Sequence, residues 1–183
     1  DLGKRLGRQD LIDKGAKLIS QHSDSTTPAT TAQSNGVPHV GYNISMSDVA
    51  PDASIVSSRI DWVPYYEYAI QAAQNGEAID TDWTGDLETG SVQLTEINEN
   101  VAAEGTAEAI EEAKAKLIDG SLQVFDTSTF TVDGKAVTEY DADVDTDPEF
   151  KGDTNVIEDG AFMESKFRSA PYFDLQIDGI ELH

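Results

Sequence analysis

A pattern of helical segment, glycine and short apolar run recurs along this chain and limits the folds open to it. Gly15 precedes the run KLIS, Gly36 precedes VPHVGYN and Gly120 precedes SLQVF, while Gly76 closes another helical segment. Glycine supplies the left-handed conformation that ends many helices, and runs rich in Val and Ile suit the strands that follow. The pattern predicts an α/β fold, a Rossmann-like three-layer arrangement of a parallel sheet between helices.

Two of the four predicted helices lie near the start of the chain. The segment Gly3 to Lys14 is charged and Leu-spaced, and it stops at Gly15. A parallel α/β lobe usually opens on a strand, so a start within a helix leads us to expect missing sequence upstream. The second helix is expected to begin with Thr27 as its N-cap and Pro28 at the first helical position.

The third and fourth predicted helices show apolar faces. The third covers residues 62–75, and its apolar stripe consists of Trp62, Tyr65, Ala69 and Ala73. The fourth repeats apolar residues at positions i, i+3 and i+7, namely Ile110, Ala113 and Leu117, with Glu112 and Lys116 paired on its exposed side. We expect these helices to cover the parallel sheet.

After Phe125 the pattern changes. Alternating β-formers flank Asp133-Gly134 in TFTVDGKAVTEY, which predicts a β-hairpin, and YFDLQIDGIEL near the end alternates like a strand. The acidic loop DADVDTDPEFKGDTN opens like a calcium loop, but Thr146 replaces the glycine of its sharp turn and Gly152 replaces the closing Glu. We therefore interpret it as a solvated loop without a metal, and composition alone does not divide the chain.

Charge and composition exclude several classes of function. The chain of 183 residues has 35 acidic and 12 basic residues, and its net charge of −23 would repel nucleic acids and anionic lipids. It has no Cys, so disulfides, thiolate metal sites and Cys nucleophiles are absent. No GxSxG, Walker A, HExxH or GxGxxG motif occurs, and the adjacent residues His22, Ser23 and Asp24 do not reach the geometry of a catalytic triad. We expect neither an enzyme nor a cofactor.

A polar segment follows each of three successive apolar runs. Ligands of parallel α/β sheets bind at the carboxyl ends of the strands, where such segments meet. There, glycine admits a ligand close to the backbone, aromatic rings stack on planar groups, and a carboxylate accepts hydrogen bonds. The candidate ligand-binding residues are Gln21, His22, Asp24, Gly41, Tyr42, Asn43, Arg59, Asp61 and Trp62.

Most of these candidates also have a purely structural interpretation. Asp24 can cap the following helix, and His22 can pack at the surface. Asn43 can form a turn at a strand end, Asp61 can be the N-cap of the third helix, and Trp62 can belong to the core. For Asp61 both interpretations can hold together, because a helix start and a cleft coincide there.

An ordered set of motifs resembles the basic membrane protein family, the substrate-binding lipoproteins of ABC importers that include purine nucleoside receptors. The motifs are QHSDS, GVPHVGYNISMSDVAPDA, SSRIDWVPYYEYAIQAAQNG, WTGDLETGSVQL and the DGK hairpin, and the resemblance covers residues 8–138. It implies a bilobed, periplasmic-binding-protein-like fold with three crossovers between the lobes. It also implies anchoring outside the cell through a lipidated N-terminal Cys, which this chain does not contain.

The resemblance further implies a function. In the family an acidic residue at the position of Asp61 contacts the nucleoside, so the chain is expected to capture a purine nucleoside or nucleobase in an interlobe cleft and deliver it to an ABC transporter permease. The protein would act at the extracellular face of the membrane or in the periplasm. The alternatives are a receptor of the same fold for another small polar ligand, such as a sugar, and a cell-surface structural or adhesion domain.

Two departures from the family qualify this expectation. The residues with which the family's N-terminal lobe grips the nucleoside have no counterpart here, and neither the acidic loop nor the tail from residue 160 matches the family's ending. The resemblance implies an α/β substrate-binding lobe over residues 1–140, followed by an acidic loop and a C-terminal strand region over residues 141–183. Within the first part, segment 59–80 would belong to the other lobe of an intact protein. Its helix would then lack its usual partner, so we expect self-association of the chain.

Overall fold

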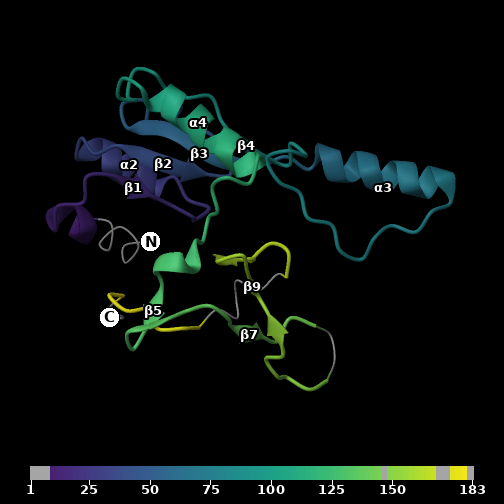
Figure 1. Cartoon of the computed structure of the whole chain (residues 1–183). Coiled ribbons are helices and arrows are strands. Elements are labelled where there is room, and N and C mark those ends of the chain that lie inside the picture. The colour runs from purple at the N-terminus through teal and green to yellow at the C-terminus, as the bar shows by residue number, and fades with distance from the viewer. Residues whose placement is uncertain (1–8, 146–147, 168–173, 181–183) are drawn as a thin grey trace. The chain divides into compact units, whose positions relative to one another are not determined.

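The computed structural model describes residues 9–145, 148–167 and 174–180 (Figure 1). The chain forms two compact units, Asp1–Ile118 and Asp119–His183, and each is described by itself. Our division at residue 140 rests on the family resemblance and stays a prediction.

The first unit is built on a four-stranded mixed sheet. Its strands are β1 (Ile19–Ser20), β2 (His39–Tyr42), β3 (Ser54–Ile60) and β4 (Val92–Leu94), in the order β1-β2-β3-β4. The first three run parallel, which confirms the α/β class, but β4 is antiparallel to β3 and a purely parallel sheet was the wrong expectation. The chain leaves the sheet where β3 ends, passes through the third helix and re-enters the sheet at the same end. Strand β4 therefore runs in the direction opposite to β3.

Helix α2 (Thr27–Ser34) packs on β1 and β2. Small side chains let the helix approach the strands closely, and the core here consists of Ile19, Ala29, Ala32, Met46, Ala50 and Ala53. The N-cap is Thr26 rather than Thr27, which places Pro28 at the second helical position. The helix begins earlier because the Ser25 hydroxyl accepts a hydrogen bond from the Thr27 N–H (3.2 Å) and takes over the capping role.

Helix α3 (Val63–Asn75) ends as predicted at Gly76, whose φ is +71°. Ala72 is its buried residue, and the segment after Gly76 runs back along the helix (Figure 1). Tyr68 donates a hydrogen bond to Asp80 (2.6 Å), and Tyr65 lies 5.4 Å from Trp83 between ring centroids. The predicted apolar stripe is therefore only partly covered.

A row of large apolar side chains remains exposed along α3 and its first turn. The row consists of Trp62, Tyr66 and Ile70, which are 59%, 57% and 56% exposed. They are spaced four residues apart and share one helix face.

Helix α4 (Thr106–Ile118) has the predicted pattern, and Lys116 pairs with Glu112 at 2.6 Å. None of its residues is buried, so it covers the sheet less than expected. Ile110 instead borders an open hollow together with Val92 and Leu94 of β4.

The predicted strand 121–125 is wrong, because these residues form bends and turns. Leu122 and Val124 are exposed, and a single bridge between Asp126 and Ala161 is the only strand-like pairing beside them in the described residues. Residues 106–118 are helical as predicted, and Gly120 follows with a φ of +76°. Residues 9–13 of the first predicted helix are also helical, whereas residues 3–8 lie outside the described part.

The predicted hairpin at Asp133-Gly134 is confirmed in the second unit. It joins β5 (Thr131–Val132) to β6 (Lys135–Ala136), and the two turn residues have φ of +51° and +74°. The Asp178 carboxylate accepts hydrogen bonds from the Thr131 hydroxyl and from both N–H groups of the turn. The predicted C-terminal strand is wrong at residues 174–180, while its residues 172–173 and 181–182 lie outside the described part.

Short antiparallel pairs make up the rest of the second unit. Strands β7 (Asp141–Ala142) and β8 (Thr154–Asn155) close the acidic loop, β9 (Ile157–Glu158) pairs with β10 (Ala161–Phe162), and a 3₁₀ turn, η1, covers Thr127–Thr129. The core here is Ala142, Val156 and Phe162. No group of three or more acidic or His side chains suited to a metal occurs in the described residues.

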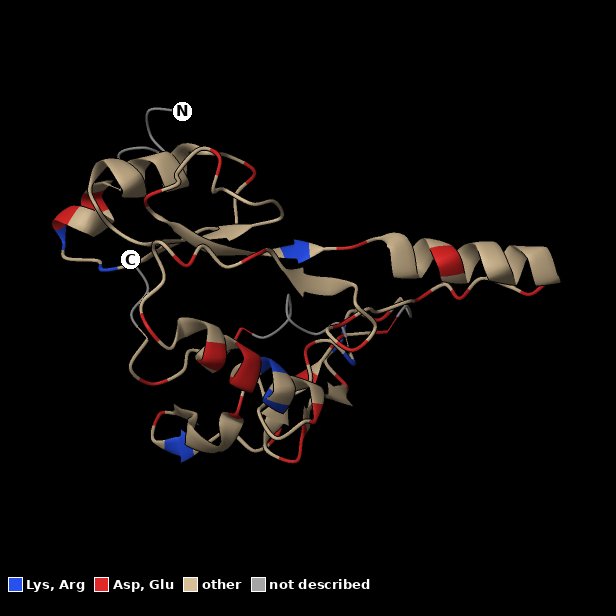
Figure 2. Ribbon diagram, turned by 90° about the horizontal axis from the view of Figure 1, so that it is seen from above, with Lys and Arg blue, Asp and Glu red and all other residues tan. Residues whose placement is uncertain are grey.

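The net charge predicts that salt stabilises this fold. Acidic side chains far outnumber basic ones along both units (Figure 2), and the chain carries −23 at pH 7. Salt shortens the range of their repulsion from about 10 Å at 0.1 M to about 3 Å at 1 M. We expect the thermal unfolding midpoint to rise by about 5 °C or more over this range of KCl concentration.

A variant with fewer charges tests the cause of this effect. Neutralising the exposed residues Glu77, Glu99 and Glu104 to Gln should raise the midpoint in low salt and flatten its salt dependence. An unfolding midpoint independent of KCl in the unmodified chain would show that repulsion does not limit stability.

The exposed row on α3 predicts self-association, because contiguous exposed apolar side chains commonly mark contact surfaces. We expect light scattering to show dimers or larger species in 2 M KCl, where charge repulsion is screened. Tyr66→Gln with Ile70→Gln should shift the chain towards monomer, and Ile79→Gln, which removes an exposed apolar side chain outside the row, should not. A monomer under all these conditions would contradict the prediction.

Candidate functional site

Three polar segments meet at one edge of the sheet. Residues 21–24 follow β1, residues 41–43 end β2, and residues 59–62 end β3. The strands are neighbours in parallel register, with Ser20 beside Val40 and Tyr42 beside Ser58. The predicted common edge is therefore confirmed, and the binding role of its residues remains a proposal.

An aromatic pair and a hollow lie where β1 and β2 end. The rings of His22 and Tyr42 stack with centroids 4.0 Å apart and an interplanar angle of 21°. Tyr42 also borders a hollow of about 310 Å³, whose wall includes Asp24, Asn43 and Ile44. Tyr42 thus provides an aromatic ring at this hollow, beside the carboxylate of Asp24 and the amide of Asn43.

Asp24 and Asn43 reach this hollow from short turns. Ser25 and Thr26 serve the start of α2, so Asp24 is not its N-cap. Asn43 has a φ of +74°, which Asn tolerates better than most residues, and its N–H donates to the Ser58 carbonyl (2.6 Å). The turn-forming interpretation of Asn43 is correct, and the turn also places the residue in the wall of the hollow.

Gly41 is required by packing within the sheet. A β-carbon at this position would lie 2.2 Å from the Ser57 hydroxyl and 3.1 Å from Cγ of Met46. Ser57 is fully buried, so a larger residue could not be accommodated without a shift. Close approach of a neighbouring side chain is thus one reason for this glycine, and the expected close approach of a ligand stays a prediction.

Gln21 uses its side-chain amide within the chain. Its Nε2 donates to the carbonyls of Ser23 (2.7 Å) and Ser25 (3.0 Å), and its Oε1 lies 2.8 Å from Nε2 of His39. The amide is thereby engaged at both ends. Gln21 holds the loop that it begins and is poorly placed to be a direct ligand contact.

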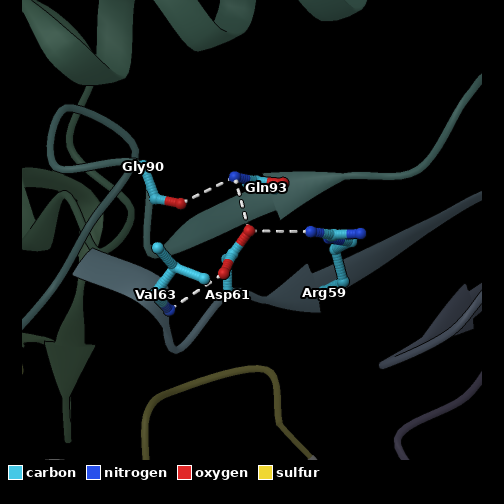
Figure 3. A network of polar contacts seen from close by, with 5 residues as sticks. All are labelled: Arg59, Asp61, Val63, Gly90 and Gln93. Atoms are coloured by element: carbon cyan, nitrogen blue, oxygen red, sulfur yellow. Dashed lines mark hydrogen bonds and ion pairs between the residues drawn. The ribbon is translucent and has the colours of Figure 1, made fainter. Parts of the chain in front are cut away.

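A polar network organises the end of β3 (Figure 3). Arg59 Nη2 lies 2.9 Å from Oδ2 of Asp61, and Gln93 Nε2 lies 3.3 Å from the same oxygen. The Val63 N–H donates to Oδ1 of Asp61 (3.0 Å), and the Gln93 amide is held in turn by the Gly90 carbonyl (2.9 Å). A carboxylate offers about four acceptor positions, so Asp61 can accept roughly one more hydrogen bond.

The same contacts stabilise the ionised form of Asp61. The hydrogen bond from the Val63 N–H lowers the pKa of its carboxyl, the positive charge of Arg59 and the Gln93 amide lower it further, and partial desolvation opposes them. Asp61 also assists the start of α3, whose first helical residue is Val63. The N-cap of α3 is Trp62, so the interpretation of Asp61 as the N-cap is wrong, because the helix begins one residue later than expected. The Asp61 carboxylate still accepts a hydrogen bond from the first helical residue.

Trp62 lies outside the core. Its side chain is 59% exposed at the N-cap position of α3, with its ring 6.3 Å from that of Tyr66. The core interpretation of Trp62 is wrong, and its ring is accessible at the end of β3.

Two residues that support the candidate site, Gln93 and His39, were not predicted from the sequence. Gln93 contacts Asp61 only because β4 turns back antiparallel to β3, with Gln93 beside Arg59. His39 is fully buried in β2 and contacts Gln21 across the sheet. In both cases the available signal was a polar residue within a strand. This signal does not identify the hydrogen-bond partner, which lies 18 positions away for His39 and 32 positions away for Gln93.

Polar segments at the carboxyl ends of parallel strands occupy the place at which α/β proteins commonly bind small molecules. The chain belongs to the PnrA-like family of ABC transporter substrate-binding proteins, whose sequence model matches residues 2–124. Proteins of this class hold a substrate without converting it, in agreement with the expectation of a chain that is not an enzyme.

Two curated relatives match the same part of the chain. A putative ABC transporter glucose-binding protein of Haloferax volcanii is 29% identical over 121 residues, which are 66% of this chain and 30% of that protein. A purine-binding protein of Brucella abortus is 28% identical over 116 residues, 63% of this chain and 32% of that protein. The chain thus spans about a third of the length of the curated relatives it matches.

Solved structures confirm the fold. An ABC transporter solute-binding protein from Conexibacter woesei superposes with a TM-score of 0.52 at 21% identity, over 66% of this chain and 41% of that one. A transcriptional activator of the comK gene from Bacillus halodurans gives a TM-score of 0.57 at 18% identity, over 67% and 43%. At these identities the likeness concerns the periplasmic-binding-protein-like fold alone.

The network around Asp61 predicts its titration. Its folded pKa is lowered, so the stabilisation from its ionised contacts is present at neutral pH and is lost as the pH falls through the folded pKa. Carbon-13 NMR of the Asp61 carboxyl should give a midpoint below the ordinary 3.8. Arg59→Met should raise the midpoint only in part, because the Val63 N–H is the larger cause. A midpoint at or above 3.8 in the unmodified chain would contradict the network.

Proposed function

We propose that this chain contributes one wall of a site that captures a purine nucleoside or nucleobase for an ABC importer. The observation that carries the proposal is the shared sheet edge, which presents the His22 and Tyr42 rings beside a hollow and an oriented Asp61 carboxylate. Family membership and the purine-binding relative from Brucella abortus support the same class of ligand.

The groups at this edge suit the two parts of a nucleoside. The accessible ring of Trp62 or the Tyr42 ring can stack on a planar base, since aromatic faces prefer offset stacking. The remaining acceptor position of Asp61 can take a hydrogen bond from a ribose hydroxyl or a base N–H. Asn43 and Asp24 add an amide and a carboxylate at the hollow, and binding is reversible without chemistry.

The proposed setting is a substrate-binding protein outside the cytoplasmic membrane. Its partner is the ABC transporter permease that receives the ligand, and in an intact protein a lipid anchor would hold it at the membrane. The described helices include none long and apolar enough to cross a membrane.

A sugar is the second candidate ligand. The relative from Haloferax volcanii is named as a glucose-binding protein, and a sugar ring also offers hydroxyls to Asp61 and an apolar face to an aromatic ring. A structural or adhesion domain without a ligand is the alternative from another class. Ultraviolet absorbance in the purine band, released from the purified protein on denaturation, favours the purine proposal, and the absence of such a release leaves the other two open.

We predict weak binding of a purine nucleoside by this chain alone. An intact two-walled site with a Kd of about 0.1–1 μM corresponds to roughly −8 to −9.5 kcal/mol. Loss of about 3–4 kcal/mol with the second wall raises Kd by two to three decades, to roughly 0.01–1 mM. Calorimetric titration with adenosine, guanosine, inosine and glucose measures this affinity and ranks the two ligand classes.

Matched variants connect the affinity to the edge. Asp61→Ala should remove most of the binding, because ligand donors are left unpaired. Glu99→Ala removes one exposed carboxylate outside this edge and should leave Kd unchanged. Submicromolar binding by the chain would show that one wall suffices, and equal affinity of the two variants would show that Asp61 is not a ligand contact.

A further inference from the structure

The loop between β1 and α2 is held from inside the sheet. Gln21 donates its two amide hydrogens to the carbonyls of Ser23 and Ser25, which flank Asp24 in the wall of the hollow. Carbonyl oxygens only accept, so the amide nitrogen faces the loop and the amide oxygen faces His39. The orientation of Gln21 is thus determined by the contacts on both sides.

This orientation assigns the proton of His39. The Gln21 oxygen accepts at 2.8 Å, so Nε2 of His39 carries hydrogen and donates to it. His39 is fully buried, and it lies beside Ile19 in the register of β1 and β2. The backbone N–H of His39 donates to the Ala53 carbonyl (2.8 Å), and this bond connects His39 to the start of β3.

We propose that His39 is a positioning residue of the ligand-binding edge, acting through Gln21 on loop 22–26. This inference rests on the proposed function for the loop's role as a binding wall. The imidazole lies within the rigid sheet, and the amide transmits its position to two loop carbonyls. Without the Nε2 hydrogen bond, the Gln21 amide loses its fixed orientation and the loop loses two of its restraints.

Two substitutions at position 39 separate positioning from packing. In His39→Gln the amide nitrogen can occupy the place of Nε2 and donate to Gln21, because both are three bonds from Cβ. In His39→Asn the amide nitrogen is one bond shorter and takes the place of Nδ1, so it cannot reach. The two variants carry the same amide group and differ only in whether that group can reach the Gln21 oxygen.

Hydrogen exchange measures the position of the loop without a ligand. We expect amide exchange in residues 22–26 to accelerate about tenfold in His39→Asn and in Gln21→Met, and to stay within about twofold of the unmodified chain in His39→Gln. Amides of β3 should be unchanged in all variants. Thermal unfolding identifies any variant whose global stability has fallen, and Gln21→Met then serves as the independent test because it leaves His39 in place.

Affinity gives the second measurement. The Kd for the best nucleoside or sugar should rise about tenfold in His39→Asn and in Gln21→Met and recover in His39→Gln. If the loop exchanges alike in the Gln and Asn variants, and Gln21→Met leaves its exchange unchanged, the positioning role is overturned. If the unmodified chain binds none of these ligands, the proposed function fails, while the exchange rates still decide whether His39 positions the loop.

Discussion

The parallel hydrogen bonding of β2 between β1 and β3 is the interaction on which the candidate site depends. It aligns three strands so that the segments after each of them leave the sheet at one edge. Residues far apart in the chain, such as His22 and Tyr42, become stacking partners only through this pairing. A shift of one residue in the register of β2 would turn His39 and Tyr42 to the opposite faces and dismantle both the support and the surface of the edge.

Two of the binding candidates, Gln21 and Asp61, are held in place by hydrogen bonds within the chain. Gln21 is held between His39 and its own loop, and Asp61 is held between Gln93, Arg59 and the start of α3. Such contacts orient functional groups before a ligand arrives and reduce the entropy lost on binding. The edge is therefore prepared by a supporting layer inside the sheet, which a description limited to exposed side chains would miss.

Few large apolar side chains are buried in the core of the first unit. The core of the first unit is rich in alanine, which buries little apolar area per residue, and no residue of α4 is buried. Ion pairs such as Lys116 with Glu112 are exposed and contribute little in water. Charge repulsion within a chain of net charge −23 therefore lowers the free energy of unfolding by an amount that matters for such a small core. The salt concentration of the solvent then affects the stability of the fold.

Local signals in the sequence determined the features that depend on neighbouring residues. The helix ends at Gly15, Gly36 and Gly76 and the turn at Asp133-Gly134 follow from backbone conformations that few residues adopt. The alternation of apolar runs and polar segments likewise indicated the α/β class and the edge at which the candidates meet. These predictions needed no knowledge of distant contacts.

Only the tertiary structure decided features that depend on partners distant in the chain. The antiparallel direction of β4, the packing of Ser57 against Gly41 and the contact of His39 with Gln21 belong to this group. So do the exposure of Trp62 and the absence of a strand at 121–125, because a side chain is buried and a strand is formed only when a second segment provides the surface or the hydrogen bonds. The sequence alone thus located the edge, and the pairing of distant segments decided which of its residues border the hollow and which hold others in place.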